Sequence, residues 1–113
     1  MTPAADTWLG GAVHLYEPDG RLALAEGIES ALAVRLLTGW PVWSTVTAGG
    51  MEAVQIPNTV RRVAIHADHD PAGLAAAERL RERLTANGCA VDVVVPPESG
   101  MDPLDVLTGA RHE

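Results

Sequence analysis

Residues 63–73 read Val-Ala-Ile-His-Ala-Asp-His-Asp-Pro-Ala-Gly, an apolar run that ends in two aspartates and a proline. A short apolar run with β-branched residues is typical of a buried strand, so we expect a strand over residues 61–67. Pro71 suits the first position of a helix, and Asp70 suits the N-cap before it. Apolar residues at helical spacing follow as far as Asn87. The stretch therefore predicts a strand that passes through a short acidic turn into a long helix.

The rest of the chain repeats this alternation of strand and helix. Strands that alternate with helices favour a parallel sheet with helices on both faces. The helix nearest the N-terminus has few polar residues and is expected to be well buried. Further strands are expected over residues 21–25, 41–46 and 90–95, and helices over 28–38, 51–56 (a short helix or turn) and 102–107.

The N-terminal part is expected to add one antiparallel strand. Residues 13–16 alternate apolar and polar side chains, and a turn signal follows at 17–20, so we expect a hairpin with residues 21–25. The predicted fold is thus a three-layer α/β/α domain. It has a mostly parallel four-stranded sheet plus an N-terminal antiparallel hairpin strand. Residues 1–11 are expected to be a flexible lead-in and residues 12–113 a single domain.

Composition excludes several classes of function. The chain of 113 residues has fifteen acids and eight arginines, and it has no lysine. This excludes lysine Schiff-base chemistry and a Walker-type phosphate loop, and it disfavours receiver and haloacid-dehalogenase-type sites. A net charge of −7 gives no electrostatic surface for gripping DNA. Cys89 is the only cysteine, so an internal disulfide and a cysteine-cluster zinc site are excluded. With neither a leader nor a long apolar run, a cytoplasmic protein without membrane contact is expected.

Acidic residues follow three of the predicted strands. Glu26 follows the first, Asp68 and Asp70 follow the third, and Asp102 and Asp105 come shortly after the last. The carboxyl ends of parallel strands share one edge of a sheet, where ligands bind. Crowded carboxylates repel one another unless a cation joins them, and Mg²⁺ prefers such hard oxygen ligands. Each acid also has a structural interpretation: N-caps for Asp70 and Asp102, and turn or first-turn positions for the others. The combination favours a metal site.

Two further features bear on substrate binding. The loop expected over residues 47–50 could present the backbone N–H groups of Gly49 and Gly50 to a phosphate, although a pair of glycines also suits an ordinary turn. His69 could support the metal ligands from behind, contact substrate or lie on the surface, and a zinc site with His66 is a weaker interpretation. Arg79, Arg81 and Arg83 are interpreted as a solvated, ion-paired helix face rather than a phosphate-binding patch.

At these acids the sequence resembles the Toprim family, which topoisomerases, bacterial-type primases and some nucleases share. Residues 22–32 resemble its first motif, residues 63–73 its Asp-x-Asp motif, and residues 100–107 the acidic segment of the primase branch. Met101 stands where that segment often has lysine, so this chain lacks the basic side chain of that segment. The resemblance runs from Ala12 to Leu107 and is strongest to phage and plasmid primases and primase-helicases.

The resemblance implies a fold and a chemistry. It implies that Asp68 and Asp70 bind Mg²⁺ or Mn²⁺, with Asp102 and Asp105 completing the site. Glu26 is then a ligand or the general acid/base. The implied function is metal-dependent nucleotidyl transfer that makes RNA primers from nucleoside triphosphates. Nucleic acid would be held by flanking parts of the parent protein, such as a zinc-binding segment and a helicase. The alternatives are a Toprim nuclease that hydrolyses phosphodiesters and a non-catalytic metal- or partner-binding module.

Overall fold

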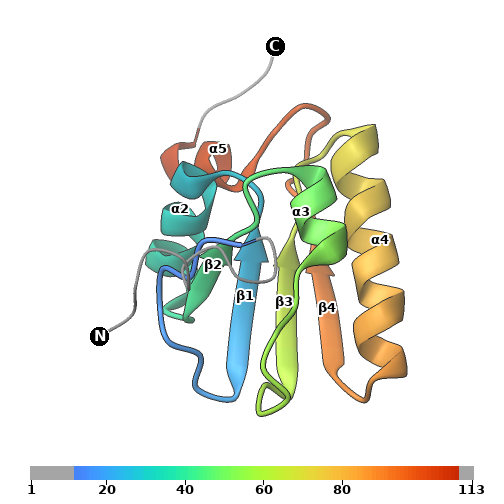
Figure 1. Ribbon diagram of the computed structural model, residues 1–113. Helices are drawn as coiled ribbons and strands as arrows, with labels where there is room; N and C mark the ends of the chain where they lie inside the picture. Colours follow the sequence, from blue (N-terminus) through green and yellow to red (C-terminus); the bar gives the residue numbers. More distant parts are fainter. Residues whose placement is uncertain (1–11, 110–113) are drawn as a thin grey trace.

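Four short parallel strands form the centre of the computed structural model, which describes residues 12–109 (Figure 1). The strands lie in the order β2-β1-β3-β4, so β1 and β3 occupy the middle of the sheet. The predicted lead-in over residues 1–11 lies outside the described residues. The strands are β1 (Arg21–Ala25), β2 (Val42–Ser44), β3 (Arg62–His66) and β4 (Ala90–Val94), and the helices are α2 (Ile28–Thr38), α3 (Ala48–Ala53), α4 (Pro71–Ala86) and α5 (Pro103–Thr108).

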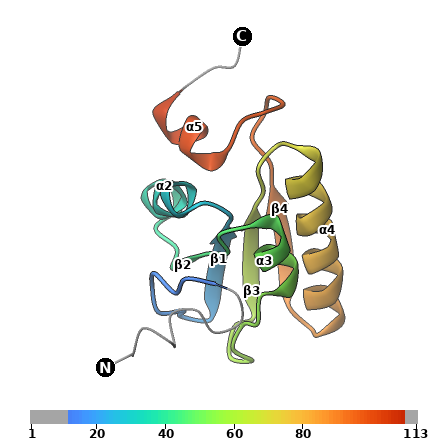
Figure 2. The ribbon, with the colours of Figure 1, turned by 45° about the horizontal axis from the view of Figure 1, so that its top comes forward.

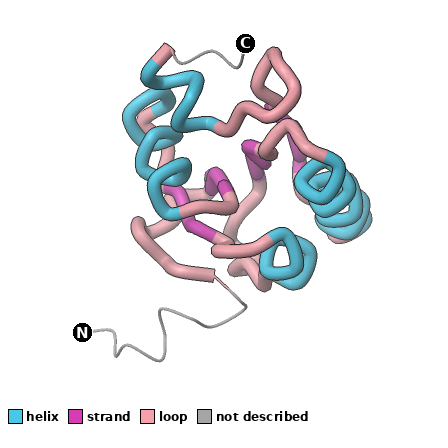
Figure 3. Tube along the Cα trace, turned by 90° about the horizontal axis from the view of Figure 1, so that it is seen from above, coloured by secondary structure: helices cyan, strands magenta, loops and turns pink. Residues whose placement is uncertain are grey.

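Helices cover both faces of the sheet, as predicted (Figures 2 and 3). Alternate residues of β1 face the helices on opposite sides of the sheet. Leu22 and Leu24 pack with the α4 residue Leu80 on one face, whereas Ala23 and Ala25 pack with α2 on the other. This is the period-two pattern of a strand buried on both sides. The three-layer α/β/α architecture is confirmed.

The outer face of α2 is more exposed than predicted. Its buried side consists of small residues, among them Ala31 and Val34. Ile28, Leu32 and Leu36 are 46%, 42% and 74% exposed. The helix is apolar on nearly all sides, but only one side can reach the sheet. The prediction of a well-buried helix is therefore wrong for this outer stripe.

The antiparallel hairpin predicted for residues 13–16 and 21–25 is wrong. β1 already has β2 on one edge and β3 on the other, so it has no free edge for a third strand. Instead, Val13 forms an isolated antiparallel bridge with Ser44 of β2. Its N–H donates to the Ser44 carbonyl oxygen at 2.7 Å, and the Ser44 N–H returns the bond at 3.1 Å. The N-terminal segment thus protects the outer edge of the sheet, where an unpaired strand would be open to association.

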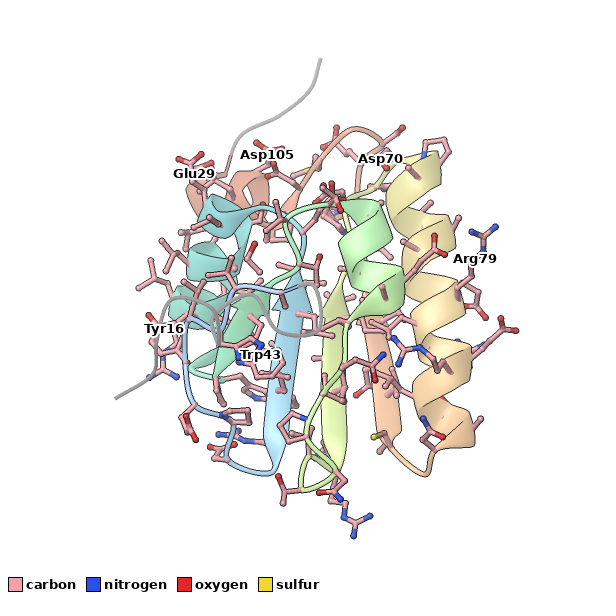
Figure 4. All side chains as sticks on the ribbon, in the orientation of Figure 1. Tyr16, Glu29, Trp43, Asp70, Arg79 and Asp105 are labelled. Carbon is pink, nitrogen blue, oxygen red and sulfur yellow. The ribbon has the colours of Figure 1, made fainter. Side chains whose placement is uncertain are left out.

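The register places the ends of the two central strands at one level. Ala25, the last residue of β1, pairs with His66, the last residue of β3. Ala25 also pairs with Ser44 at the end of β2. The segments that follow these strands therefore emerge side by side at one rim of the sheet. Figure 4 shows Asp70 and Asp105 at this rim, above the arrowheads of the strands.

Candidate metal-binding site at the strand ends

Glu26 is held by the loop that follows β2. Its carbonyl oxygen accepts a hydrogen bond from the Ser44 hydroxyl at 2.7 Å and another from the Val46 N–H at 2.8 Å. These bonds fix the backbone at the end of β1 and leave the half-buried carboxyl group at the rim. Burial, and then the negative charge of Asp70, raise the pKa of Glu26 above its usual value.

Val46 adopts a strained conformation at this loop. Its φ of +69° lies in the left-handed region, and within residues 12–109 no other non-glycine residue has a positive φ. A β-branched side chain is poorly tolerated there. Such strain costs about 1–3 kcal/mol and often marks functional sites. Here it accompanies the two hydrogen bonds that position Glu26.

Replacing Val46 with glycine should relieve this strain. We expect Val46→Gly to raise the free energy of unfolding by about 1 kcal/mol, because glycine adopts a positive φ without penalty. Urea unfolding measures the change. The control is Val94→Gly, at a position of similar exposure (45% against 40%) but in a strand, where glycine should destabilise. Equal losses in both variants would show that the Val46 backbone carries no strain.

The Asp-x-Asp turn is built around Gly73. The Asp70 carboxylate caps α4 by accepting a hydrogen bond from the Gly73 N–H at 2.7 Å. The N-cap interpretation of Asp70 is therefore confirmed. A Cβ atom on Gly73 would lie 2.7 Å from the Asp68 carbonyl oxygen and 3.1 Å from the Asp70 carboxylate. The sequence shows two small residues, Ala72 and Gly73, at the start of this helix, but it does not show that Gly73 lets α4 approach the turn so closely.

Asp68 is the electrostatic centre of the cluster. Its Oδ1 atom is buried and accepts no hydrogen bond from the described residues. Burial, and then the negative charges of Glu26, Asp102, Asp70 and Asp105, together raise the pKa of Asp68 to about 6. The five predicted acids therefore do converge on one place. An orphaned buried carboxylate oxygen among like charges is costly unless a cation or a proton joins it.

Asp102 and Asp105 reach the rim on the first turn of α5. The Asp102 carboxylate accepts from the Asp105 N–H at 2.9 Å, and the Asp105 carboxylate accepts from the Asp102 N–H at 3.0 Å. This is a reciprocal capping box. The structural interpretation of Asp102 as an N-cap is confirmed, whereas Asp105 is the half-buried partner in the capping box rather than a solvated helix acid. A carboxylate that caps through one oxygen still has a second oxygen for another partner.

Gly49 and Gly50 do not lie in the predicted loop, and phosphate binding by their N–H groups stays a prediction. α3 begins three residues earlier than expected, so both glycines lie in its first turn. The Gly50 N–H already donates to the Thr47 hydroxyl at 2.8 Å. The loop prediction is wrong because Thr47 is an effective N-cap, which starts the helix despite the glycines.

The arginines of α4 are engaged in ion pairs and backbone contacts. Arg81 pairs with Glu78 on the same helix, and Arg79 pairs with Glu52 of α3 at 3.1 Å (Arg79 is labelled in Figure 4). Arg83 donates to the carbonyl oxygens of Glu52 and Val54. This face of α4 is ion-paired, as the sequence predicts. Arg79 and Arg83 also hold α4 against α3 and the residue that follows it.

The donor set fits a hard divalent cation better than zinc. The acids supply only oxygen ligands, which suit Mg²⁺ or Mn²⁺. Cys89 lies at the opposite end of the sheet, with its Sγ atom 3.6 Å from the Val60 carbonyl oxygen. Among residues 12–109, no three His, Cys, Asp or Glu side chains already stand in a metal-ligating arrangement. Closing the carboxylates around a cation would thus require side-chain rotation.

Hollows lie at both ends of the sheet. The larger, about 540 Å³, is at the amino ends of the strands and is lined by residues of the 55–61 loop and by Arg83, Asn87 and Cys89, with no acidic cluster. A shallower one of about 300 Å³ adjoins the acidic rim, between the start of α2 and Asp102. Of the five acids, Asp102 lines the second hollow and none lines the first. The end of the sheet that carries the acids is therefore the candidate site, despite the smaller volume of its hollow.

Comparison with known proteins identifies the family. A family model described as the Toprim domain matches residues 21–111. The chain belongs to the Toprim family. The resemblance predicted from the three motifs is confirmed, and the acidic rim lies at the carboxyl ends of the strands of this Toprim domain. No curated protein sequence matches the chain.

Two solved structures share the fold of this Toprim domain. A DNA primase domain from Pseudomonas aeruginosa superposes with a TM-score of 0.59 at 21% identity, over 79% of this chain and 29% of that one. The DnaG catalytic core superposes with a TM-score of 0.63 at 22% identity, over 96% of this chain and 38% of that one. The chain thus spans well under half of either primase chain. None of the described helices is long and apolar enough to cross a membrane.

Proposed function

We propose that this Toprim domain catalyses metal-dependent nucleotidyl transfer, as the catalytic part of a DNA primase that makes RNA primers from nucleoside triphosphates. The observation that carries the proposal is the buried, unpartnered Oδ1 of Asp68 among four other acids. The fold shared with two primase catalytic domains supports it.

Each acid has a role in this proposal. Asp68 and Asp70 hold Mg²⁺ or Mn²⁺, and Asp102 and Asp105 complete the ligand set. When bound, the cation supplies charge neutralisation for the attacking and leaving oxygens of an in-line displacement. Glu26 either joins the ligands or exchanges a proton with the reacting hydroxyl. Its raised pKa suits the second role, because a carboxyl group titrating nearer neutrality is a better acid/base.

The charge of the chain limits what the domain can do by itself. At net −7 it repels a nucleic-acid backbone. We therefore propose that template and triphosphates are held mainly by flanking parts of a longer protein, such as a zinc-binding segment or a helicase. The same charge favours a second candidate, in which the isolated domain binds metal but is catalytically silent.

Metal titration and an activity assay test the proposal. Calorimetry with Mn²⁺ should show binding to the wild type and at least tenfold weaker binding to the Asp68→Asn, Asp70→Asn double variant. The matched control is Asp92→Asn, an exposed acid in the middle of β4. Equal binding by wild type and double variant would refute the metal site.

The activity assay separates the candidate functions. The domain is incubated with single-stranded DNA, Mn²⁺ and labelled nucleoside triphosphates. Labelled primers support nucleotidyl transfer, whereas shortened DNA without triphosphates indicates a nuclease. Metal binding with neither product supports the silent module.

A further inference from the structure

His69 lies between the two aspartates of the turn and contacts the loop that carries Asp102. Its N–H donates to the Met101 carbonyl oxygen at 2.8 Å, and its own carbonyl oxygen accepts from the Gly100 N–H at 2.8 Å. Its ring Nδ1 lies 2.9 Å from the Pro96 carbonyl oxygen. Within residues 12–109, each hydrogen bond found between residues 68–70 and residues 96–102 involves His69.

The bond from the ring has a defined direction. A carbonyl oxygen can only accept a hydrogen bond. Nδ1 is therefore the protonated ring nitrogen, and it donates a hydrogen bond to the Pro96 carbonyl oxygen. Pro96 is buried, whereas His69 is partly exposed. Pro96 and Pro97 lack N–H groups, so the loop has few donors of its own with which to anchor itself after β4. The imidazole supplies the missing donor.

We propose that His69 is a positioning residue, whose imidazole fixes the loop over residues 96–101 and thereby holds Asp102 beside Asp68. The inference rests on the metal site proposed above, in which Asp102 is a ligand. The substrate contact of His69 stays a prediction, and the positioning role does not depend on it. The imidazole in the middle of the Asp-x-Asp turn thus positions Asp102, which lies 33 positions later in the chain.

Three substitutions separate the hydrogen bond from the rest of the ring. In His69→Asn, the amide nitrogen takes the place of Nδ1 and can donate to Pro96. In His69→Gln, the amide nitrogen corresponds instead to Nε2 and does not reach Pro96 in the same way. His69→Ala removes the donor altogether. All three keep the two backbone bonds to Gly100 and Met101.

The first measurement is Mn²⁺ affinity by calorimetry, with thermal unfolding to show that each variant is folded. We expect about tenfold weaker binding for His69→Ala and His69→Gln, the usual effect of losing a residue that orients a ligand. His69→Asn should stay within about twofold of the wild type. Wild-type affinity in His69→Ala would overturn the proposal, as would an affinity in His69→Asn as weak as that of His69→Ala.

The second measurement needs no metal. Amide hydrogen exchange of Gly100, followed by NMR in the metal-free protein, reports opening of the loop. We expect exchange about tenfold faster in His69→Ala and His69→Gln, and near-wild-type exchange in His69→Asn. Unchanged exchange in all three overturns the positioning role. Failure of the wild type to bind Mn²⁺ would instead refute the proposed metal site, while the exchange experiment still reports on the loop.

Discussion

Replacing Gly73 with alanine should destabilise the domain by about 1–2 kcal/mol. A Cβ atom there would lie 2.7 Å from the Asp68 carbonyl oxygen, and backbone cannot move aside as a flexible side chain can. Overpacking of this kind costs about 1–3 kcal/mol or more, which exceeds the gain of about 1 kcal/mol in helix propensity. Urea unfolding of the metal-free protein measures the change. Because the shift falls on Asp68 and Asp70, Mn²⁺ affinity should fall too.

Gly49→Ala is the matched control for Gly73→Ala. Gly49 also lies in the first turn of a helix, but its nearest atom would be the Thr47 hydroxyl oxygen at 3.8 Å, an ordinary contact. We expect this variant to be more stable than the wild type by about 0.5–1 kcal/mol. If Gly73→Ala is as stable as Gly49→Ala, then the turn has room for a side chain and the close approach does not constrain it.

Replacing Asp68 with asparagine should have opposite effects on stability and on metal binding. The pKa of Asp68 is raised from 3.8 to about 6, so the fold favours the protonated carboxyl group. The favourable contribution of the neutral form is fully present below pH 3.8 and is lost as the pH rises to about 6. Above pH 6 the charged form destabilises the metal-free fold by at most about 3 kcal/mol, which solvent screening at this partly exposed group reduces to about 1–2 kcal/mol.

The expected results for Asp68→Asn follow from these signs. At pH 7.5 in EDTA the variant should be about 1–2 kcal/mol more stable than the wild type, whereas at pH 3.5 the two should be equal. Its Mn²⁺ affinity should fall at least tenfold. In the wild type, Mn²⁺ affinity should drop about tenfold between pH 6 and pH 5, because protons compete for the carboxylate. Asp92→Asn, away from the cluster, should show neither effect. A loss of metal-free stability at pH 7.5 would contradict the raised pKa.

The sequence predicts best where local chemistry decides the structure. Asp70 and Pro71 specify the start of α4, and Gly39 specifies the end of α2, so those bounds agree closely with the prediction. Parallel strands bring their carboxyl ends to one edge of the sheet. The prediction that the acids lie at one rim therefore needs only the order of the strands and helices. The charges of all four other acids raise the pKa of Asp68, which is consistent with one acidic rim. The role of these acids as metal ligands stays a prediction.

The errors come from interactions between distant parts of the chain. Residues 13–16 have a strand pattern, but the strand that they pair with depends on the order of the sheet. Both edges of β1 are already paired, with β2 and β3. The contact of His69 with Pro96 joins residues 27 positions apart, so no local motif announces it. The close approach at Gly73 is visible only once the backbone is placed. The sequence shows only that a small residue lies in the first turn of the helix. That observation alone does not tell whether glycine is needed there for close packing.

The level register of β1 and β3 also determines where this chain tolerates changes of length. Deleting one residue within β1 would withdraw Glu26 by about 3.3 Å and turn its side chain to the opposite face of the sheet. The acidic rim would lose a member without any acid being replaced. The segment between α3 and β3, at the other end of the sheet, leads into β3 without entering the register of β1 and β3. Extra residues there would leave the rim intact, so variation in length among related chains should accumulate at the amino ends of the strands.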